Sequence, residues 1–256
     1  MSEADDLLGR KLFFLHPSAV VRNRVVEELT QQEFEVYLVT DALQQKKMLK
    51  KYSGSIVFAC IQEKMTEKEW EKWIVDVIKD PATKNTDIGI ICTGASDNDA
   101  LREKYIKQIG IKCGFTVIKS DLSIAMRELY EILKAADAKG RRKYIRATME
   151  SDANAKVNLN VNGEYVNGSI KDISVVGFSC VLKSGTEINK NTLFPDIQIK
   201  LGAIILKAEG IVFGSRMEGE EKAYVIIFTQ RIDPEVRTKI RKYIQSNLQA
   251  KLDAEM

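Results

Sequence analysis

Residues 135–150 read Ala135-Ala-Asp-Ala-Lys-Gly-Arg-Arg-Lys-Tyr-Ile-Arg-Ala-Thr-Met-Glu150, and the hydrophobic pattern of the chain changes across this stretch. Before it, short apolar runs alternate with helical stripes, whereas after it apolar residues recur at every second position. The chain has 256 residues, which is enough for two cores of modest size. We therefore predict a first domain at residues 1–136, a linker at residues 137–150 and a second domain at residues 151–256.

The first domain contains five units of strand followed by helix. The predicted strands are Lys11–Leu15, Phe34–Val39, Ser55–Cys60, Ile88–Cys92 and Phe115–Ile118. Such short apolar runs are typical of a parallel sheet covered on both faces. Ser18 or Pro17 opens the first helix. Asp121 caps the fifth helix, and Gly140 is expected to end it. The pattern predicts an α/β doubly wound five-stranded parallel sheet, whose ligand sites lie at the carboxyl ends of its strands.

The second domain is predicted to be all-β. Asn162-Gly163 is a signal for a tight hairpin turn between two alternating runs. Further alternating runs raise the number of strands to six, which predicts a six-stranded antiparallel barrel. A final helix begins at Asp233-Pro234. It carries apolar residues at i+4 spacing, namely Val236, Ile240, Ile244, Leu248 and Leu252. We expect this stripe to pack on the barrel, with its last two turns open to a partner helix as an alternative.

Composition excludes several classes of function. The 39 basic and 36 acidic residues are interspersed, so we expect no binding to duplex DNA. His16 is the only histidine, and the four cysteines are far apart without a C-x-x-C pair, which argues against a zinc site and a disulfide framework. No apolar run reaches the roughly 18 residues of a membrane span, and the first residues lack a signal-peptide pattern. We expect a soluble cytoplasmic protein without membrane insertion.

The first domain resembles a response-regulator receiver domain in the order and spacing of its elements. A working receiver has two acidic residues after the first strand, an aspartate after the third, Ser or Thr after the fourth and Lys after the fifth. The corresponding residues here are His16, Pro17, Cys60, Thr93 and Lys119. Mg²⁺ and phosphoryl transfer require the missing carboxylates. The resemblance therefore implies a pseudo-receiver that is not phosphorylated and serves as a docking or homodimer surface, with Cys60 as a buried packing residue.

Two motifs stand out here: Arg142-Lys-Tyr-Ile-Arg146 in the predicted linker, and Asp172-Ile-Ser174-Val-Val-Gly177 in the predicted second domain. They fit the R-x-x-x-R and D-x-S-x-x-G motifs of the PilZ family of cyclic di-GMP receptors, which residues 141 to about 245 resemble. The resemblance implies a cyclic di-GMP site rather than an enzyme, with no cofactor and no metal. The implied ligand-binding residues are Arg141, Arg142, Arg146, Asp172, Ser174 and Gly177.

The chemistry of these residues suits a cyclic dinucleotide. The planar fork of an arginine binds guanine O6 and N7, spans phosphate oxygens or stacks on a purine. Asp172 offers a carboxylate to the guanine N1–H and N2–H groups, and Gly177 permits a close approach or a positive φ. Relatives with an arginine in the position of Arg141 often bind an intercalated dimer of the ligand. We therefore expect two molecules per domain.

The expected function is that of a bacterial cyclic di-GMP effector that regulates a protein partner in motility, secretion or development. Ligand binding is expected to order the arginine segment and to change the arrangement of the two domains. One alternative is a PilZ-like protein-interaction scaffold that does not bind nucleotide. A second alternative is a phosphorylated response regulator with a PilZ output, which the missing carboxylates disfavour. A third is a single-stranded nucleic-acid binder, which the scarcity of aromatic residues among the basic ones disfavours. Trp70 and Trp73 are expected to pack in the core rather than to form a partner surface.

Overall fold

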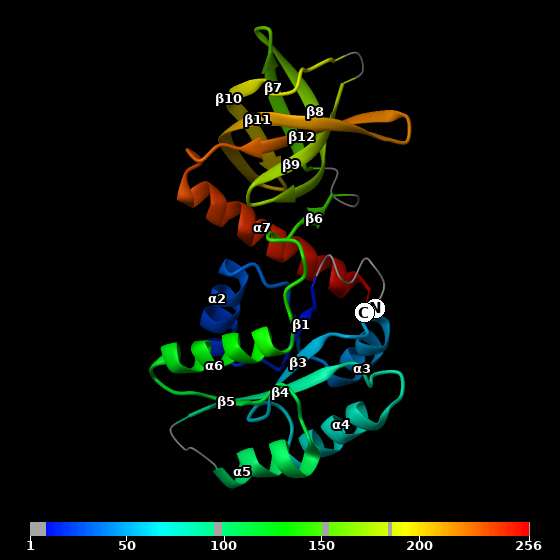
Figure 1. Cartoon of the computed structure of the whole chain (residues 1–256), viewed down its shortest axis with the longest axis vertical. Coiled ribbons are helices and arrows are strands. Elements are labelled where there is room, and N and C mark those ends of the chain that lie inside the picture. The colour runs from blue at the N-terminus through cyan, green and yellow to red at the C-terminus, as the bar shows by residue number, and fades with distance from the viewer. Residues whose placement is uncertain (1–8, 95–98, 150–153, 184–185, 256) are drawn as a thin grey trace. The chain divides into compact units, whose positions relative to one another are not determined.

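The computed structural model describes residues 9–94, 99–149, 154–183 and 186–255, except for the side chains of residues 42 and 43. The chain divides into two units (Figure 1). Unit 1 comprises Met1–Lys143 and Lys251–Met256, and unit 2 comprises Tyr144–Ala250. The predicted domain ends at residues 1, 150, 151 and 256 lie outside the described residues, and the predicted boundaries stay a prediction. No helix in the described ranges combines the length and the apolar character that a membrane crossing requires.

Unit 1 is built on a parallel sheet of five strands in the order β2-β1-β3-β4-β5 (Figure 1). The strands are β1 (Leu12–Leu15), β2 (Val36–Val39), β3 (Ile56–Cys60), β4 (Asp87–Thr93) and β5 (Phe115–Ile118). β1 pairs with both β2 and β3, so that Leu12 lies opposite Val36 on one side and Ile56 on the other. These strands are almost wholly buried, as expected for a sheet covered on both faces. The predicted α/β class is confirmed.

The helices of unit 1 lie between the strands along the chain. They are η1 (Val21–Val25), α2 (Val26–Gln31), α3 (Ala42–Lys51), α4 (Glu67–Lys79), α5 (Asp99–Glu103), η2 (Lys104–Ile109) and α6 (Leu122–Ala135). Asp121 caps α6 as predicted, because its carboxylate accepts a hydrogen bond from the amide of Ser123. The predicted end of this helix at Gly140 is wrong. α6 ends at Ala135, and Asp137 turns the chain with a left-handed φ of 49°.

Unit 2 is a closed six-stranded antiparallel barrel. Its strands follow the order β8-β7-β10-β11-β12-β9, and β9 pairs again with β8. They are β7 (Lys156–Val161), β8 (Glu164–Ser174), β9 (Gly177–Leu182), β10 (Leu193–Leu201), β11 (Ile204–Glu218) and β12 (Glu221–Phe228). A short strand, β6 (Ala147–Thr148), adds to β8 and was not predicted. Because closure leaves all six strands paired on both sides, the predicted barrel is confirmed.

Local sequence signals explain two features of the barrel. Asn162 and Gly163 join β7 to β8 with φ values of 54° and 92°, the pair of positive angles that a tight type I′ hairpin requires. The last helix, α7 (Pro234–Ala254), packs across one end of the barrel (Figure 1). Ile240 and Ile244 are buried in the barrel core, and Val236 is partly buried against it. The predicted stripe therefore covers the barrel from Val236 to Leu248, whereas its last residue, Leu252, is not part of the barrel core.

The closing contact between β9 and β12 depends on Gly177. A Cβ atom at this position would lie 2.3 Å from the carbonyl oxygen of Ile226 and 3.0 Å from the Cα of Ile227. Both neighbours are backbone atoms of β12, which cannot move without shifting the strand. Gly177 therefore serves the close approach of two strands. Its φ is not in the left-handed region.

The substitution Gly177→Ala is expected to lower the melting temperature of unit 2 by about 5 °C or more, because overpacking against backbone costs roughly 1–3 kcal/mol. Scanning calorimetry of the full chain would measure this change. Gly214→Ala in β11 is the matched control, since a Cβ there meets no atom within 4 Å and φ is not positive. Equal melting temperatures for the two variants would contradict the proposed role of Gly177.

Helix α4 begins with a capping box. The Thr66 side chain accepts a hydrogen bond from the amide of Glu69, and the Glu69 carboxylate accepts one from the amide of Thr66. One turn later, Trp70 is fully buried and donates from its indole nitrogen to the carbonyl oxygen of Glu63. Both tryptophans of the chain, Trp70 and Trp73, lie in α4. Tryptophan fluorescence therefore reports on unit 1.

Thr66→Ala is expected to lower the unfolding free energy of unit 1 by about 1 kcal/mol, because one amide at the start of α4 loses its partner. Denaturant unfolding followed by tryptophan fluorescence is the measurement. Thr66→Ser keeps the hydroxyl group and should retain most of the stability. A loss of the same size in both variants would show that the cap is not the cause.

Candidate functional site

The second of the two motifs forms the turn between β8 and β9. Ser174 pairs with Gly177 across a two-residue turn. The Ser174 hydroxyl donates to the carbonyl oxygen of Gly177 at 3.1 Å and accepts from the amide of Val176 at 3.4 Å. Ser174 is buried, and both of these bonds are to backbone. In this structure its hydroxyl supports the turn that holds the end of β8 in place.

The carboxylate of Asp172 is the centre of a polar cluster at the barrel surface. Oδ1 accepts from Nη1 of Arg146 at 3.4 Å, and Oδ2 accepts from Nη2 of Arg216 at the same distance. Oδ2 also accepts a hydrogen bond from the hydroxyl of Ser179. The Asp172 side chain is 16% exposed, whereas those of Arg146 and Arg216 are 45% and 46% exposed. One largely covered carboxylate therefore holds two guanidinium groups that solvent and ligands can reach.

Strand pairing places small residues beside this cluster. Asp172 lies opposite Ser179 on β9, which lies opposite Val225 on β12, and Val225 lies opposite Gly214 on β11. None of these neighbours of Asp172 has a long side chain. The strands between the two arginines therefore carry only short side chains in this row.

The first motif begins in the segment that leads into β6. Arg141 and Arg142 are exposed, and the segment from residue 138 to residue 146 is neither helix nor strand. Arg146 directly precedes β6, which pairs with the end of β8 at Asp172. This pairing brings together Arg146 of the first motif and Asp172 of the second, which are 26 residues apart.

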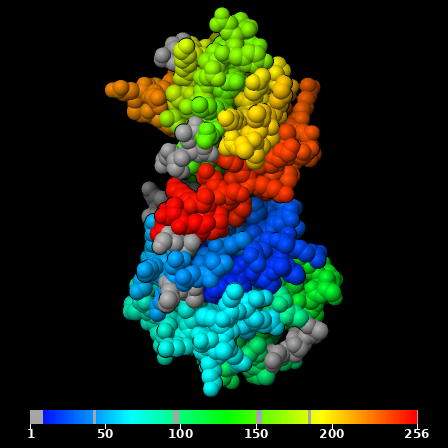
Figure 2. Space-filling view, turned by 180° about the vertical axis from the view of Figure 1, so that it is seen from behind, coloured from blue at the N-terminus to red at the C-terminus, as the bar shows by residue number. Residues whose placement is uncertain are grey.

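Ser179 and Arg216 were missed by the sequence analysis. Ser179 follows Gly177 by two residues on one strand, so alternation along β9 places both on the same face. Arg216 lies 44 residues after Asp172. It lies near the end of β11, in the β11–β12 hairpin that projects from the barrel (Figure 2). Only the registers of β8, β9, β12 and β11 place it near Asp172, and no local pattern encodes them.

An apolar row borders the motif residues on the outer barrel surface. Leu193, Ile211 and Ile227 are exposed. Leu193 pairs with Ile211, Ile211 with Ile227, and Ile227 with Gly177. Phe213 is also exposed, and the ammonium group of Lys190 lies 5.6 Å from the centre of its ring. Exposed apolar side chains thus form a continuous row up to the glycine of the second motif.

The receiver-like residues lie at the carboxyl ends of the strands of unit 1. His16 and Pro17 follow β1, Cys60 ends β3, Thr93 ends β4 and Lys119 follows β5. A doubly wound fold gathers such residues at one edge of its sheet.

The side chains at this edge of the sheet differ chemically from the carboxylates of a working receiver. Burial raises the pKa of the Cys60 thiol to about 12. Burial, followed by the charge of Lys64, lowers the pKa of His16. The hydroxyl of Thr93 donates to Oε1 of Gln62 at 3.0 Å. Among the described residues, no three His, Cys, Asp or Glu side chains gather into a group that could hold a metal ion.

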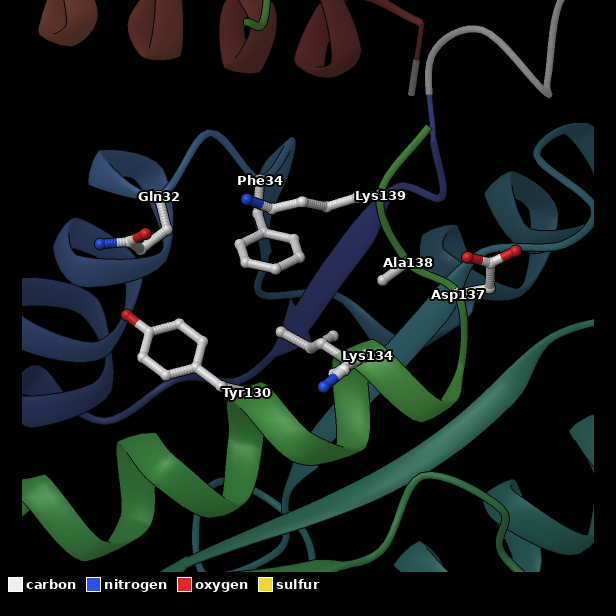
Figure 3. A pocket seen from close by; sticks show the side chains of 8 residues that line it. Gln32, Phe34, Tyr130, Lys134, Asp137, Ala138 and Lys139 are labelled. Carbon is white, nitrogen blue, oxygen red and sulfur yellow. The ribbon is translucent and has the colours of Figure 1, made fainter. Parts of the chain in front are cut away.

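A cavity of about 350 Å³ lies elsewhere in unit 1 (Figure 3). Phe34 and Tyr130 line it, with their ring centres 6.5 Å apart, and Lys134 and Lys139 also contribute. The ammonium group of Lys139 lies 4.8 Å from the centre of the Phe34 ring, and the Tyr130 hydroxyl donates to Glu28. No residue of the two motifs and none of the receiver-like residues lines this cavity.

Several solved structures are similar to this chain. The PilZ domain of YcgR from Escherichia coli with c-di-GMP is 13% identical, with a TM-score of 0.39, over 45% of this chain and 97% of its own. The Bacillus subtilis inhibitor of motility (MotI/DgrA) is 18% identical, with a TM-score of 0.36, over 44% of this chain and 52% of its own. MrkH of K. pneumonia in its c-di-GMP complex is 17% identical, with a TM-score of 0.39, over 46% of this chain and 57% of its own. The matched part therefore spans little more than half of the last two proteins.

A comparison with curated proteins gives no match. The family model of the PilZ domain matches residues 140–246. This range contains both motifs, all strands of the barrel and the part of α7 that covers it. It excludes the parallel sheet of unit 1. Residues 140–246 of this chain therefore form a PilZ domain.

Proposed function

We propose that the protein is a receptor for cyclic di-GMP and that it binds this ligand without catalysing a reaction. The observation that carries this proposal is the meeting of Arg146 with Asp172 at the barrel surface, at 3.4 Å. A PilZ domain that keeps R-x-x-x-R and D-x-S-x-x-G supports the same ligand. Phosphates and guanine edges are the groups that arginine and aspartate recognise best.

Each motif residue has a proposed role at the ligand. Arg142 and Arg146 bind phosphate oxygens and the O6 and N7 atoms of guanine, and they stack on the purine rings. Asp172 accepts from the N1–H and N2–H groups of a guanine. Ser174 and Gly177 maintain the turn that sets the position of Asp172. Arg141 contacts a second ligand molecule, which gives two molecules of cyclic di-GMP per domain.

Isothermal titration with cyclic di-GMP tests the receptor proposal. The wild-type chain is expected to bind with a Kd in the micromolar range or below, at about two molecules per chain. Arg142→Ala and Arg146→Ala are each expected to raise Kd at least tenfold, because a hydrogen bond to a charged group contributes about 1.5–3 kcal/mol. A stoichiometry of one would contradict only the role of Arg141.

Arg231→Ala is the matched control for this titration. Its side chain is 85% exposed, and its only described ion pair, to Glu209, is 4.0 Å long. The variant removes one positive charge from the same unit without touching either motif, so its Kd should stay within about twofold of wild type. No heat from the wild-type protein would overturn the receptor proposal.

Regulation is proposed to follow from the connection between the units. Ligand binding fixes Arg141 and Arg142 on the barrel and thereby orders the segment that connects α6 to β6. The two units then adopt a different arrangement, which a protein partner in motility, secretion or development recognises. Unit 1 is proposed to offer the docking or homodimer surface.

Small-angle scattering measures this rearrangement. Cyclic di-GMP is expected to change the radius of gyration and the distance distribution of the wild-type chain. It should leave those of Arg146→Ala unchanged at ligand concentrations that saturate only the wild type. Identical curves for the wild type with and without ligand, at saturation, would exclude the rearrangement while leaving the receptor proposal intact.

A second candidate function is a protein-interaction scaffold that does not bind nucleotide. The exposed apolar row of Leu193, Ile211 and Ile227 favours it, because such surfaces mark interaction sites in soluble proteins. The titration separates the two candidates, since a scaffold would give no heat with cyclic di-GMP.

A further inference from the structure

Arg216 belongs to neither motif, yet it shares the carboxylate of Asp172 with Arg146. Its Nη2 donates to Oδ2 of Asp172 at 3.4 Å, and Arg146 occupies Oδ1. The two arginines approach the carboxylate from different elements, one from the segment before β6 and one from β11. A group that replaced Asp172 as an acceptor would therefore find a guanidinium on each side.

Arg216 extends over short side chains of β12 and β9. Arg216 pairs with Ala223 on β12, and Ala223 pairs with Val181 on β9. Next to this row lies the one formed by Ser179 and Val225. All these side chains are short, so the guanidinium of Arg216 reaches Asp172 over the strands between them. The guanidinium itself is 46% exposed, so a planar base could stack on its face or accept from its donors.

A second acid competes for the same guanidinium. Oε1 of Glu218 accepts from Nε of Arg216 at 2.8 Å and from Nη2 at 2.5 Å. These contacts are shorter than the one to Asp172, so Glu218 is the principal partner of Arg216 in this structure. The side chains of Arg216 and Glu218 are 46% and 35% exposed. Ion pairs at the surface contribute only about 0–1 kcal/mol to stability. A phosphate or a guanine edge can therefore take the guanidinium from Glu218.

We propose that Arg216 is a fourth ligand-binding arginine of the site, in addition to Arg141, Arg142 and Arg146, and that Glu218 limits the affinity by competing for it. The proposal rests on the proposed function, with a cyclic dinucleotide as the ligand. Arg216 binds a phosphate or a guanine edge on the side of the ligand away from Arg146. The β11–β12 hairpin thus becomes part of the binding site, and its two charged residues set the affinity in opposite directions.

Titration of the full chain with cyclic di-GMP tests this assignment. Arg216→Gln is expected to raise Kd about tenfold or more, because a charge-assisted contact is lost. Glu218→Gln is expected to lower Kd about threefold. In the double variant, Glu218→Gln should have no further effect, since its influence passes through Arg216. Lys207 and Asp196 form a comparable exposed ion pair between β11 and β10, and Lys207→Gln and Asp196→Asn serve as controls for the change in charge.

The outcomes are distinct. If the wild type binds and Arg216→Gln binds within twofold of it, as Lys207→Gln does, the assignment of Arg216 is wrong while the receptor proposal stands. If Glu218→Gln lowers Kd equally with and without Arg216, Glu218 acts only through its charge, and the competition is wrong. If the wild type gives no heat, the proposed function fails and this inference fails with it. Unchanged melting temperatures of unit 2 would show that the variants are folded.

Discussion

The pairing of β9 with both β8 and β12 is the constraint on which unit 2 depends. It turns a row of strands into a closed barrel, and it requires Gly177, where any side chain would meet the backbone of β12. The Ser174 hydroxyl holds the turn at the same point. The residues that close the barrel are thus neighbours of Asp172 in sequence and in space. The six residues from Asp172 to Gly177 therefore serve both the closure of the barrel and the position of the Asp172 carboxylate.

Electrostatics explains how this site can be both ordered and open. Asp172 and Glu218 compensate the charges of Arg146 and Arg216, so the four side chains together carry no net charge. The Arg216–Glu218 pair is exposed enough to contribute little to stability, and both contacts of Asp172 to the arginines are long, at 3.4 Å. The arrangement orients the arginines without holding them strongly. An anionic ligand with several acceptors can therefore replace the carboxylates, which a buried ion pair would not allow.

Much of the architecture could be predicted because it depends on local patterns. Five apolar runs with helices between them define the parallel sheet, and Asn162-Gly163 defines a hairpin whose two positive φ values require these residues. The end of α6 could not be read from Gly140, because Asp137 takes the left-handed conformation three residues earlier. A glycine after a helix marks a possible end, and packing decides which residue is used.

The candidate site was predictable only in part, because strand pairing rather than local sequence brings some of its residues together. Arg146 and Asp172 were found through their motifs, and β6, which brings them together, is too short to leave a pattern. Arg216 depends on the registers of four strands. Registers follow from the whole barrel, so a sequence read locally cannot pair residues 44 positions apart.

The four buried cysteines have a consequence for the conditions under which the protein works. Burial raises the pKa of Cys60, Cys113 and Cys180 to about 12 and that of Cys92 to about 11. Peroxides attack the thiolate, which at neutral pH is then on the order of one molecule in ten thousand or fewer. Burial and the raised pKa therefore both slow the oxidation of these four thiols.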